Sequence, residues 1–254
     1  MAILPVIQPA IVRGIANVIG YNSNEGDVPG PVPPGPQGFK IPAITAGSPV
    51  TQAFKTASGN VVVRIAAKNA TAVAQNITAT YGGAAMTRLD CPGLTSQVNG
   101  DYLVAFVIRG AAPGTADIVL TAGAGSSVVN CMVRVGDITV LPADWQGNIT
   151  GYANSPLSTS YEVDTNLLTA SPGNNVIGNM AMWTEVAASP IQLDMDDRTA
   201  SEFEQWNDYY GDVAARFGYQ DDAPADTSLY VYFANGGNRR GGAMMLFELK
   251  GATV

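Results

Sequence analysis

Histidine is absent from all 254 residues of the chain, and only two cysteines occur, Cys91 and Cys131. Without an imidazole the chain lacks the base of Ser-His-Asp and Cys-His nucleophiles and a common ligand of zinc and iron. Two thiols are also too few for a tetrathiolate metal site. The sequence therefore predicts no catalytic residue, no bound metal and no cofactor.

The scarcity of cysteine also argues against a disulfide framework of the kind found in small secreted domains. We favour the interpretation that Cys91 and Cys131 are buried, reduced thiols, because free cysteine is among the most buried residue types. Their spacing alone does not fix whether they pair, so that alternative stays open at this point.

Charge is scarce as well, since only 13% of the residues are charged. Thirteen basic residues face 21 acidic ones, the net charge is −8, and no run of five or six Lys or Arg occurs. Nucleic-acid binding through phosphate neutralisation is therefore not expected. The apolar N-terminus, residues 1–20, lacks a basic leader and is interrupted by Pro5 and Pro9. It predicts neither a signal peptide nor a membrane-inserted span.

Gly, Ala, Val, Thr and Asn dominate what remains, and from about residue 43 they form short apolar runs separated by turn residues. Runs of this length and composition predict β-strands. The predicted strands cover residues 60–69, 75–81, 84–89, 101–110, 116–122, 127–141, 148–153, 160–168, 175–186, 227–234 and 243–251. The sequence predicts an all-β fold, an antiparallel β-sandwich that is jelly-roll-like, with an extended N-terminal anchor arm. It shows no fixed-period internal repeat.

Two glycines mark details of this pattern. Gly82 and Gly83 separate two runs by two residues, and Gly-Gly tolerates the positive φ angles of a tight hairpin turn. We expect them to form a hairpin tip. We expect the long run 127–141 to be bent or broken at Gly136.

The clearest boundary is a segment with five prolines and four glycines, residues 26–39. Such a composition predicts a semi-rigid, extended spacer. We therefore divide the chain into an N-terminal docking segment, residues 1–25, a Pro/Gly-rich linker, residues 26–42, and a β-sandwich body, residues 43–254.

One interval, residues 196–222, is acidic and rich in aromatics, and it is the place where we expect a helix or a long functional loop. It contains Trp206, Tyr209 and Tyr210. Flat rings with polar edges suit sugar binding. They also suit packing against the body or a neighbouring subunit, and we favour this packing role. We expect core positions for four further residues: Trp145, Trp183, Met244 and Met245.

Two acidic patterns carry alternatives. Asp194, Asp196 and Asp197 could supply calcium ligands, but the segment lacks the Gly and Glu of an EF-hand loop, so a solvated turn is favoured. A carboxylate pair could support glycan hydrolysis without histidine. Its candidates by residue type include Glu162, Glu185, Glu202 and Glu204, although no spacing among them is diagnostic.

The segments "ITATYGGAAMTRL" (77–89) and "GDYLVAFVIRGAAPGTADIVLTAG" (100–123) carry a resemblance to a known group. They resemble a β-domain of virion proteins of tailed bacteriophages and gene transfer agents, in which a "TYGG-x-x-MT" hairpin precedes a strand pair. The matching stretch runs from about Val61 to Leu120, and the resemblance does not extend to the C-terminal half.

The resemblance implies a jelly-roll or immunoglobulin-like sandwich of the kind used in decoration or cement proteins, head spikes and tail fibres. It implies a non-enzymatic structural protein located in the virion, attached to the major capsid protein or to tail or spike-base proteins, often as a homotrimer. The projecting body would stabilise the particle or bind host-surface polysaccharide. The alternatives are a carbohydrate-binding module that uses Trp206, Tyr209 and Tyr210 and, less favoured, a carboxylate-based glycan hydrolase.

Overall fold

A computed structural model describes residues 37–70, 75–89, 101–137, 149–154, 160–165, 176–185, 193–194, 204–220, 229–234 and 239–249. All regular structure in these residues is β-strand, and the strands of each sheet pair antiparallel. The predicted all-β, antiparallel fold is therefore confirmed. The described residues also include no helix with the length and hydropathy needed to cross a membrane.

The first half of the chain forms two sheets. Their strands are β1 (Gln37–Thr45), β2 (Val50–Thr56), β3 (Val61–Asn69), β4 (Ile77–Tyr81), β5 (Ala84–Ala85), β6 (Thr87–Leu89), β7 (Asp101–Ile108), β8 (Gly114–Ala122) and β9 (Ser127–Asp137). Sheet I has the order β1-β9-β3-β7-β6, and sheet II has the order β2-β8-β4-β5.

Apart from β4–β5 and β6–β7, each of which stays within one sheet, successive strands of this half pass back and forth between the two sheets. β1, β3, β7 and β9 lie in sheet I, whereas β2, β4 and β8 lie in sheet II. This alternation, with the first and last strands adjacent, is the connectivity of a jelly roll. The core between the sheets contains Val63, Ile65, Phe106 and, from sheet II, Phe54 and Ile118. We call residues 37–137 roll 1.

The double glycine has the predicted role. Gly82 and Gly83 have φ angles of 55° and 81°, and they connect β4 to β5 with Tyr81 opposite Ala84. Two successive positive φ angles define the hairpin turn whose twist matches that of the flanking strands. The hairpin prediction is confirmed.

The second half of the chain also forms two sheets. Their strands are β10 (Ile149–Asn154), β11 (Ser160–Thr165), β12 (Val176–Glu185), β13 (Leu193–Asp194), β14 (Glu204–Tyr210), β15 (Val213–Gln220), β16 (Leu229–Ala234) and β17 (Arg239–Leu249). Sheet III has the order β10-β17-β12-β15-β14, and sheet IV has the order β11-β16-β13. We call residues 149–249 roll 2.

The strand order of roll 2 repeats that of roll 1. Reading across sheet I and sheet III, β1, β9, β3, β7 and β6 correspond in order to β10, β17, β12, β15 and β14. Each roll also has one register shift near the end of its third strand, after Ala66 in β3 and after Thr184 in β12. The chain thus contains a structural repeat that its sequence does not display as a fixed period.

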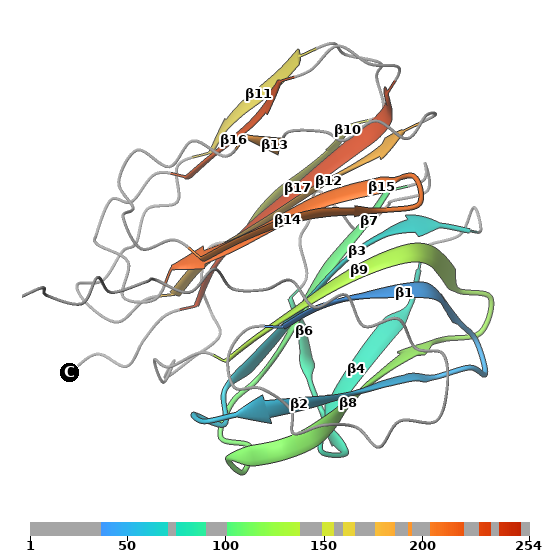
Figure 1. Ribbon diagram of the computed structural model, residues 1–254, viewed down its shortest axis with the longest axis vertical. Coiled ribbons are helices and arrows are strands. Elements are labelled where there is room, and N and C mark those ends of the chain that lie inside the picture. Colours follow the sequence, from blue (N-terminus) through green and yellow to red (C-terminus); the bar gives the residue numbers. More distant parts are fainter. Residues whose placement is uncertain are drawn as a thin grey trace, which may run out of the picture.

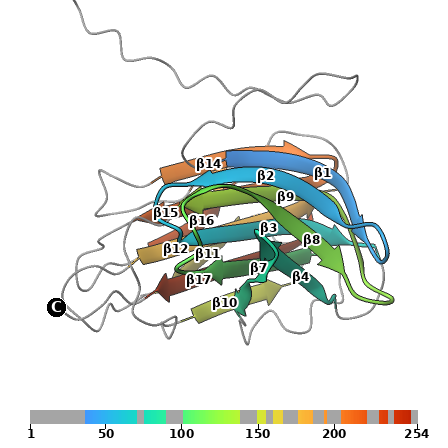
Figure 2. The same ribbon diagram turned by 90° about the horizontal axis from the view of Figure 1, so that it is seen from below.

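The four sheets stack in the order IV, III, I and II (Figure 1). Sheet I has sheet II on one face and sheet III on the other (Figure 1), and in a view along the stack the sheets lie over one another (Figure 2). The residues from Val61 to Ala67 in β3 are accordingly all buried. A strand covered on both faces needs an almost continuous apolar run rather than an alternating one, which explains "VVVRIAA".

Three boundary predictions were wrong. β1 begins at Gln37, so residues 37–42 belong to a strand of the body and not to the linker. β9 runs through Gly136 without a break, and its irregularity lies at Asn130, which has a φ of 52°. The described part of the interval 196–222 forms the β14–β15 hairpin rather than a helix or a long loop. Residues 1–36, which hold the docking segment and most of the linker, lie outside the described residues.

Candidate functional site

In the described residues, the two rolls meet where sheet I contacts sheet III. Apolar side chains make up much of this interface. Val62 and Ala66 of β3 are buried but lie outside the core of roll 1. Side chains alternate along a strand, so these two residues are on the face opposite that core, toward sheet III. From sheet III the interface receives Val213, Ala215, Phe217 and Met245, which are also buried.

An arginine lies within this apolar contact. Arg64 of β3 is 0% exposed, and its Cζ is 5.8 Å from the centre of the Phe217 ring in β15. A guanidinium over an aromatic face gains about 0.5–2 kcal/mol, with the larger values at desolvated sites such as this one. Arg64 thereby ties the third strand of roll 1 to the hairpin of roll 2.

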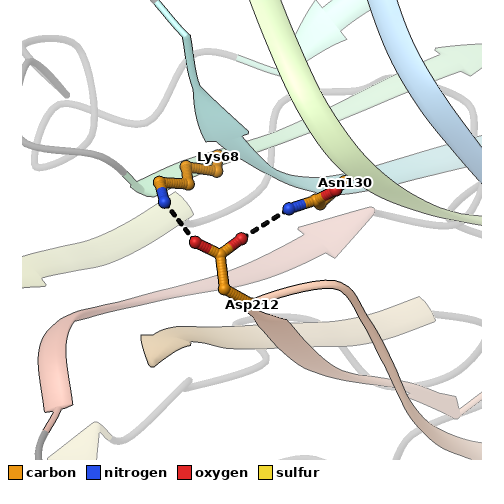
Figure 3. Close-up of polar contacts among 3 residues, drawn as sticks. All are labelled: Lys68, Asn130 and Asp212. Atoms are coloured by element: carbon orange, nitrogen blue, oxygen red, sulfur yellow. Dashed lines mark hydrogen bonds and ion pairs between the residues drawn. The ribbon is translucent and has the colours of Figure 1, made fainter. Parts of the chain in front are cut away.

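A polar cluster also joins the two rolls, and we call Lys68, Asn130 and Asp212 the Asp212 latch (Figure 3). Lys68 Nζ in β3 donates to one carboxylate oxygen of Asp212, and Asn130 Nδ2 in β9 donates to the other at 2.5 Å. Asp212 lies in the turn between β14 and β15. One carboxylate from roll 2 therefore joins two strands of roll 1.

Local backbone geometry places these groups. β9 has an extra residue where it pairs with β3 between Ala66 and Lys68, and Asn130 has a positive φ there. Such a bulge redirects a side chain out of the regular sheet. The turn of roll 2 then comes so close that a Cβ on Gly211 would lie 2.5 Å from the Asn130 amide. Only glycine fits at this point without displacing the amide.

The hydrogen bonds of the latch determine the direction in which the pKa of Asp212 is shifted. Burial raises the pKa of Asp212, but the hydrogen bonds from Lys68 and Asn130 and the attraction of the Lys68 charge outweigh it. The pKa of Asp212 is therefore below its ordinary value. The two charged side chains are 38% and 28% exposed, so solvent screens the pair and its contribution to stability is modest.

A second carboxylate organises one end of roll 1. Asp137 accepts hydrogen bonds from the Thr56 hydroxyl at 2.6 Å, the Ser58 hydroxyl at 2.5 Å and the Ala57 backbone N–H at 2.6 Å. Burial raises the pKa of Asp137, but the hydrogen bonds from Ser58, Thr56 and the backbone of residues 57–58 outweigh it and lower the pKa. This cluster fastens the β2–β3 turn to the end of β9.

The aromatic residues singled out from the sequence lie on an edge strand. Trp206, Tyr209 and Tyr210 belong to β14, opposite Phe217, Ala214 and Val213 of β15, respectively. Tyr210 is half-buried, whereas the side chains of the other two lie outside the described part of the structure. Glycan binding by these three residues remains a prediction.

The described strands place two of the acidic candidates in one row, because Glu162 of β11 and Asp194 of β13 both lie opposite Tyr232 of β16. Glu162, Glu185 and Glu204 belong to three strands, β11, β12 and β14, and Asp194 ends β13. Glu202, Asp196 and Asp197 lie outside the described residues. Within the described ranges no group of three or more His, Cys, Asp or Glu residues is placed to hold a metal ion.

The expected core positions are described only in part. Cys131 is a buried free thiol, and burial raises its pKa to about 12. Met245 is buried as predicted. Cys91 and Trp145 lie outside the described residues, as do the side chains of Trp183 and Met244.

The sequence did not identify the latch or Arg64, although two signals were present. An arginine within the apolar run "VVVRIAA" indicates a charge that must be accommodated inside. Gly211-Asp212 between two strand-like segments is a hairpin-turn pair. Neither signal reveals that the two segments meet.

We expect Gly211→Ala to destabilise the protein more than Gly125→Ala does. Both glycines have positive φ angles, 62° and 78°, but a Cβ at Gly125 meets nothing within 4 Å. The shared backbone cost is about 1 kcal/mol, and the collision with Asn130 adds to it only at Gly211. Urea unfolding of both variants measures the difference. In a protein that also carries Asn130→Ala, Gly211→Ala should lower the free energy of unfolding no more than Gly125→Ala does. Equal losses of free energy for the two glycine variants in the wild-type background would contradict the close approach of Gly211 to Asn130.

We expect Asp137→Asn to flatten the acid limb of the stability curve. The folded-state pKa is below the unfolded value of about 3.9, so the unfolded chain binds more protons between the two. The stabilisation is fully present above about pH 4 to 5 and is lost as pH falls through the folded pKa. Free energies of unfolding from pH 7 to pH 2 should converge for wild type and variant toward the acid end. A constant gap at every pH would contradict this role of the carboxylate.

Comparisons with known proteins add no identification. No protein-family model matches the chain, and no curated protein matches it. Among solved structures, it is similar to a chain of the crystal structure of the plant peptide RALF23 in complex with FER and LLG2. That match has 11% identity and a TM-score of 0.26, and it covers 85% of this chain and 91% of the other. At this TM-score the likeness carries no argument about fold or function.

Proposed function

We propose that the protein is a non-enzymatic structural component of a phage or phage-like virion. In this proposal residues 1–25 dock on the major capsid protein or on tail or spike-base proteins, and the two rolls project outward. The projecting body stabilises the particle or binds host-surface polysaccharide, and several copies assemble, with a homotrimer as the expected state.

The observation that carries the proposal is the stack of two jelly rolls, which contact each other through sheet I and sheet III. Sheet I is covered on both faces, and contacts across to sheet III include the Arg64–Phe217 pair and the Asp212 latch. Interfaces of this kind keep two units in one orientation. A stack with a fixed orientation suits a projecting element, because its outer end then stays at a defined distance from its attachment point.

The sequence resemblance supports the same proposal at one place. The stretch from Val61 to Leu120 corresponds to β3 through β8 of roll 1 and includes the Gly82–Gly83 hairpin. The residues that carry the resemblance are therefore structural parts of a jelly roll, and no catalytic residue is transferred with them. A jelly roll is also a common architecture of viral capsid and lectin domains.

Attachment to a particle explains how weak contacts suffice. Many copies on one surface hold their outer ends at high local concentration, and avidity then exceeds the affinity of each single contact by about 10²–10⁴. The outer end can therefore act as a stabilising cement or as a host-binding spike without a deep pocket.

Deletion of residues 1–25 tests the attachment. We expect the shortened protein to stay folded, with the far-ultraviolet circular dichroism of a β-protein, and to be absent from purified particles. The measurement is the amount of protein in particles assembled with wild-type or shortened protein, relative to the major capsid protein.

The matched control is Asp137→Asn, which perturbs the end of roll 1 but leaves residues 1–25 intact. It should still enter particles at the wild-type level. Incorporation of the shortened protein at that level would refute the docking role, and failure of the full-length chain to associate with any particle would refute the proposed function.

A further inference from the structure

The Asp212 latch brings together an amine, an amide and a carboxylate. Lys68 Nζ and the Asn130 amide each donate a hydrogen bond to a different oxygen of the Asp212 carboxylate (Figure 3). The amine and the amide come from two neighbouring strands, β3 and β9, and are held on one carboxylate. A lysine amine is a nucleophile in its neutral form, and a carboxyl group bonded to both partners can move protons between them. These three groups are sufficient to join two side chains through an amide bond.

Strand pairing keeps the two side chains of roll 1 close together. Lys68 lies opposite Val129, so Asn130 is the next residue along β9 from its partner. In a regular strand that next side chain points to the opposite face, but the bulge at Asn130 turns its amide toward the same carboxylate as Lys68. On the side of roll 2, a Cβ on Gly211 would lie 2.5 Å from the Asn130 Cγ. The turn of roll 2 therefore packs directly against the amide carbon.

We propose that the chain forms an isopeptide bond between Lys68 Nζ and Asn130 Cγ, with Asp212 as the catalytic residue that transfers the protons. The bond links β3 to β9 within roll 1. It forms once in each molecule and consumes no external substrate, so it is a self-modification that is compatible with a structural role. Because Asp212 belongs to roll 2, the bond forms only after the two rolls have docked. The inference does not depend on the proposed virion role.

The reaction proceeds by proton transfers through Asp212. The Lys68 ammonium gives one proton to the carboxylate along their hydrogen bond, which leaves a neutral amine and a carboxylic acid. The Asn130 amide turns by half a rotation about Cβ–Cγ, a change that hardly alters its shape, so that Oδ1 accepts a hydrogen bond from the acid. The amine lone pair then attacks Cγ.

Departure of ammonia completes the reaction. Asp212 passes a proton from the attacking nitrogen to Nδ2 of Asn130, the Cγ–Nδ2 bond breaks, and the nitrogen leaves with the remaining proton as ammonium. One C–N bond forms and one C–N bond breaks. The carboxylate of Asp212 is regenerated, and the reaction needs neither an oxidant nor a reductant.

The first proton transfer is uphill, because a lysine amine binds a proton more strongly than an aspartate does. The hydrogen bonds that lower the pKa of Asp212 add to this cost. Partial burial of both side chains opposes it, since desolvation disfavours the charged forms. Bond formation is therefore slow compared with folding, which is sufficient for a bond that forms once.

Mass spectrometry of the full-length protein tests the bond. After prolonged incubation of the folded protein at neutral pH, we expect its intact mass to be lower than that of its sequence by one ammonia molecule. Trypsin cleaves after Lys and Arg, so digestion of the denatured protein should leave peptides 65–88 and 110–134 joined, with no cleavage after Lys68. The joined pair should have the sum of the two peptide masses less one ammonia.

Three variants serve as controls. Lys68→Arg keeps a positive charge beside Asp212 but removes the nucleophile, and Asp212→Asn removes the group that transfers protons. Both should retain the full mass and yield separate peptides, with the far-ultraviolet circular dichroism of the folded wild type. Lys55→Arg replaces an exposed lysine of β2 and should lose ammonia as the wild type does.

The wild-type result decides the matter even if a variant fails to fold. Joined peptides in the wild type support the bond. An unchanged wild-type mass overturns it, as does a missing ammonia confined to the separate peptide 110–134, which indicates ring closure of Asn130 on its own backbone. Joined peptides that persist in Asp212→Asn overturn the catalytic role of Asp212.

Discussion

The burial of the outer face of sheet I against sheet III is the constraint on which the rest of the structure depends. Val62 and Ala66 face away from the core of roll 1 and would be exposed to water in an isolated roll. Completely burying a side chain of valine size contributes about 1.5–3 kcal/mol, so an array of them makes separation of the rolls costly. The polar groups at this interface, Arg64 and the Asp212 latch, add orientation more than affinity.

This constraint explains how far the sequence predicts the fold. Strand-sized apolar runs and turn glycines identified most of the strands of roll 1, and the Gly82–Gly83 hairpin lies where expected. Two strands of roll 1, β1 and β2, were not predicted, and in β1 Gly38 and Pro42 interrupt the pattern. The sequence interpretation misread β14 and β15 because an acidic, aromatic segment has the composition of a loop, although pairing within a sheet overrides that local preference.

The duplication and the latch could not be predicted for a different reason. Strand order is a property of three-dimensional pairing, and equivalent strands such as β3 and β12 need share only a length and an apolar character. Asp212 is 144 residues from Lys68 in the sequence, so no local pattern joins them. Arg64 within the apolar run of β3 indicates a charge that must be accommodated inside the protein, but it does not indicate which segment covers it.

The same interface connects structure to function. The proposed projecting role rests on this stack, in which apolar side chains, Arg64 and the Asp212 latch join the two rolls. The residues singled out for sugar binding, Trp206, Tyr209 and Tyr210, lie in β14 at the edge of sheet III. Binding there would connect ligand recognition to the hairpin that carries the Asp212 latch.

The packing of Arg64 on Phe217 gives the most direct measure of this account. Protons held over an aromatic ring resonate upfield, so the side-chain signals of Arg64 should be shifted upfield in the nuclear magnetic resonance spectrum of the intact protein. They should return toward ordinary positions in Phe217→Leu, which keeps an apolar side chain but removes the ring current. Unshifted Arg64 signals that are identical in both proteins would show that sheet I and sheet III do not meet as described.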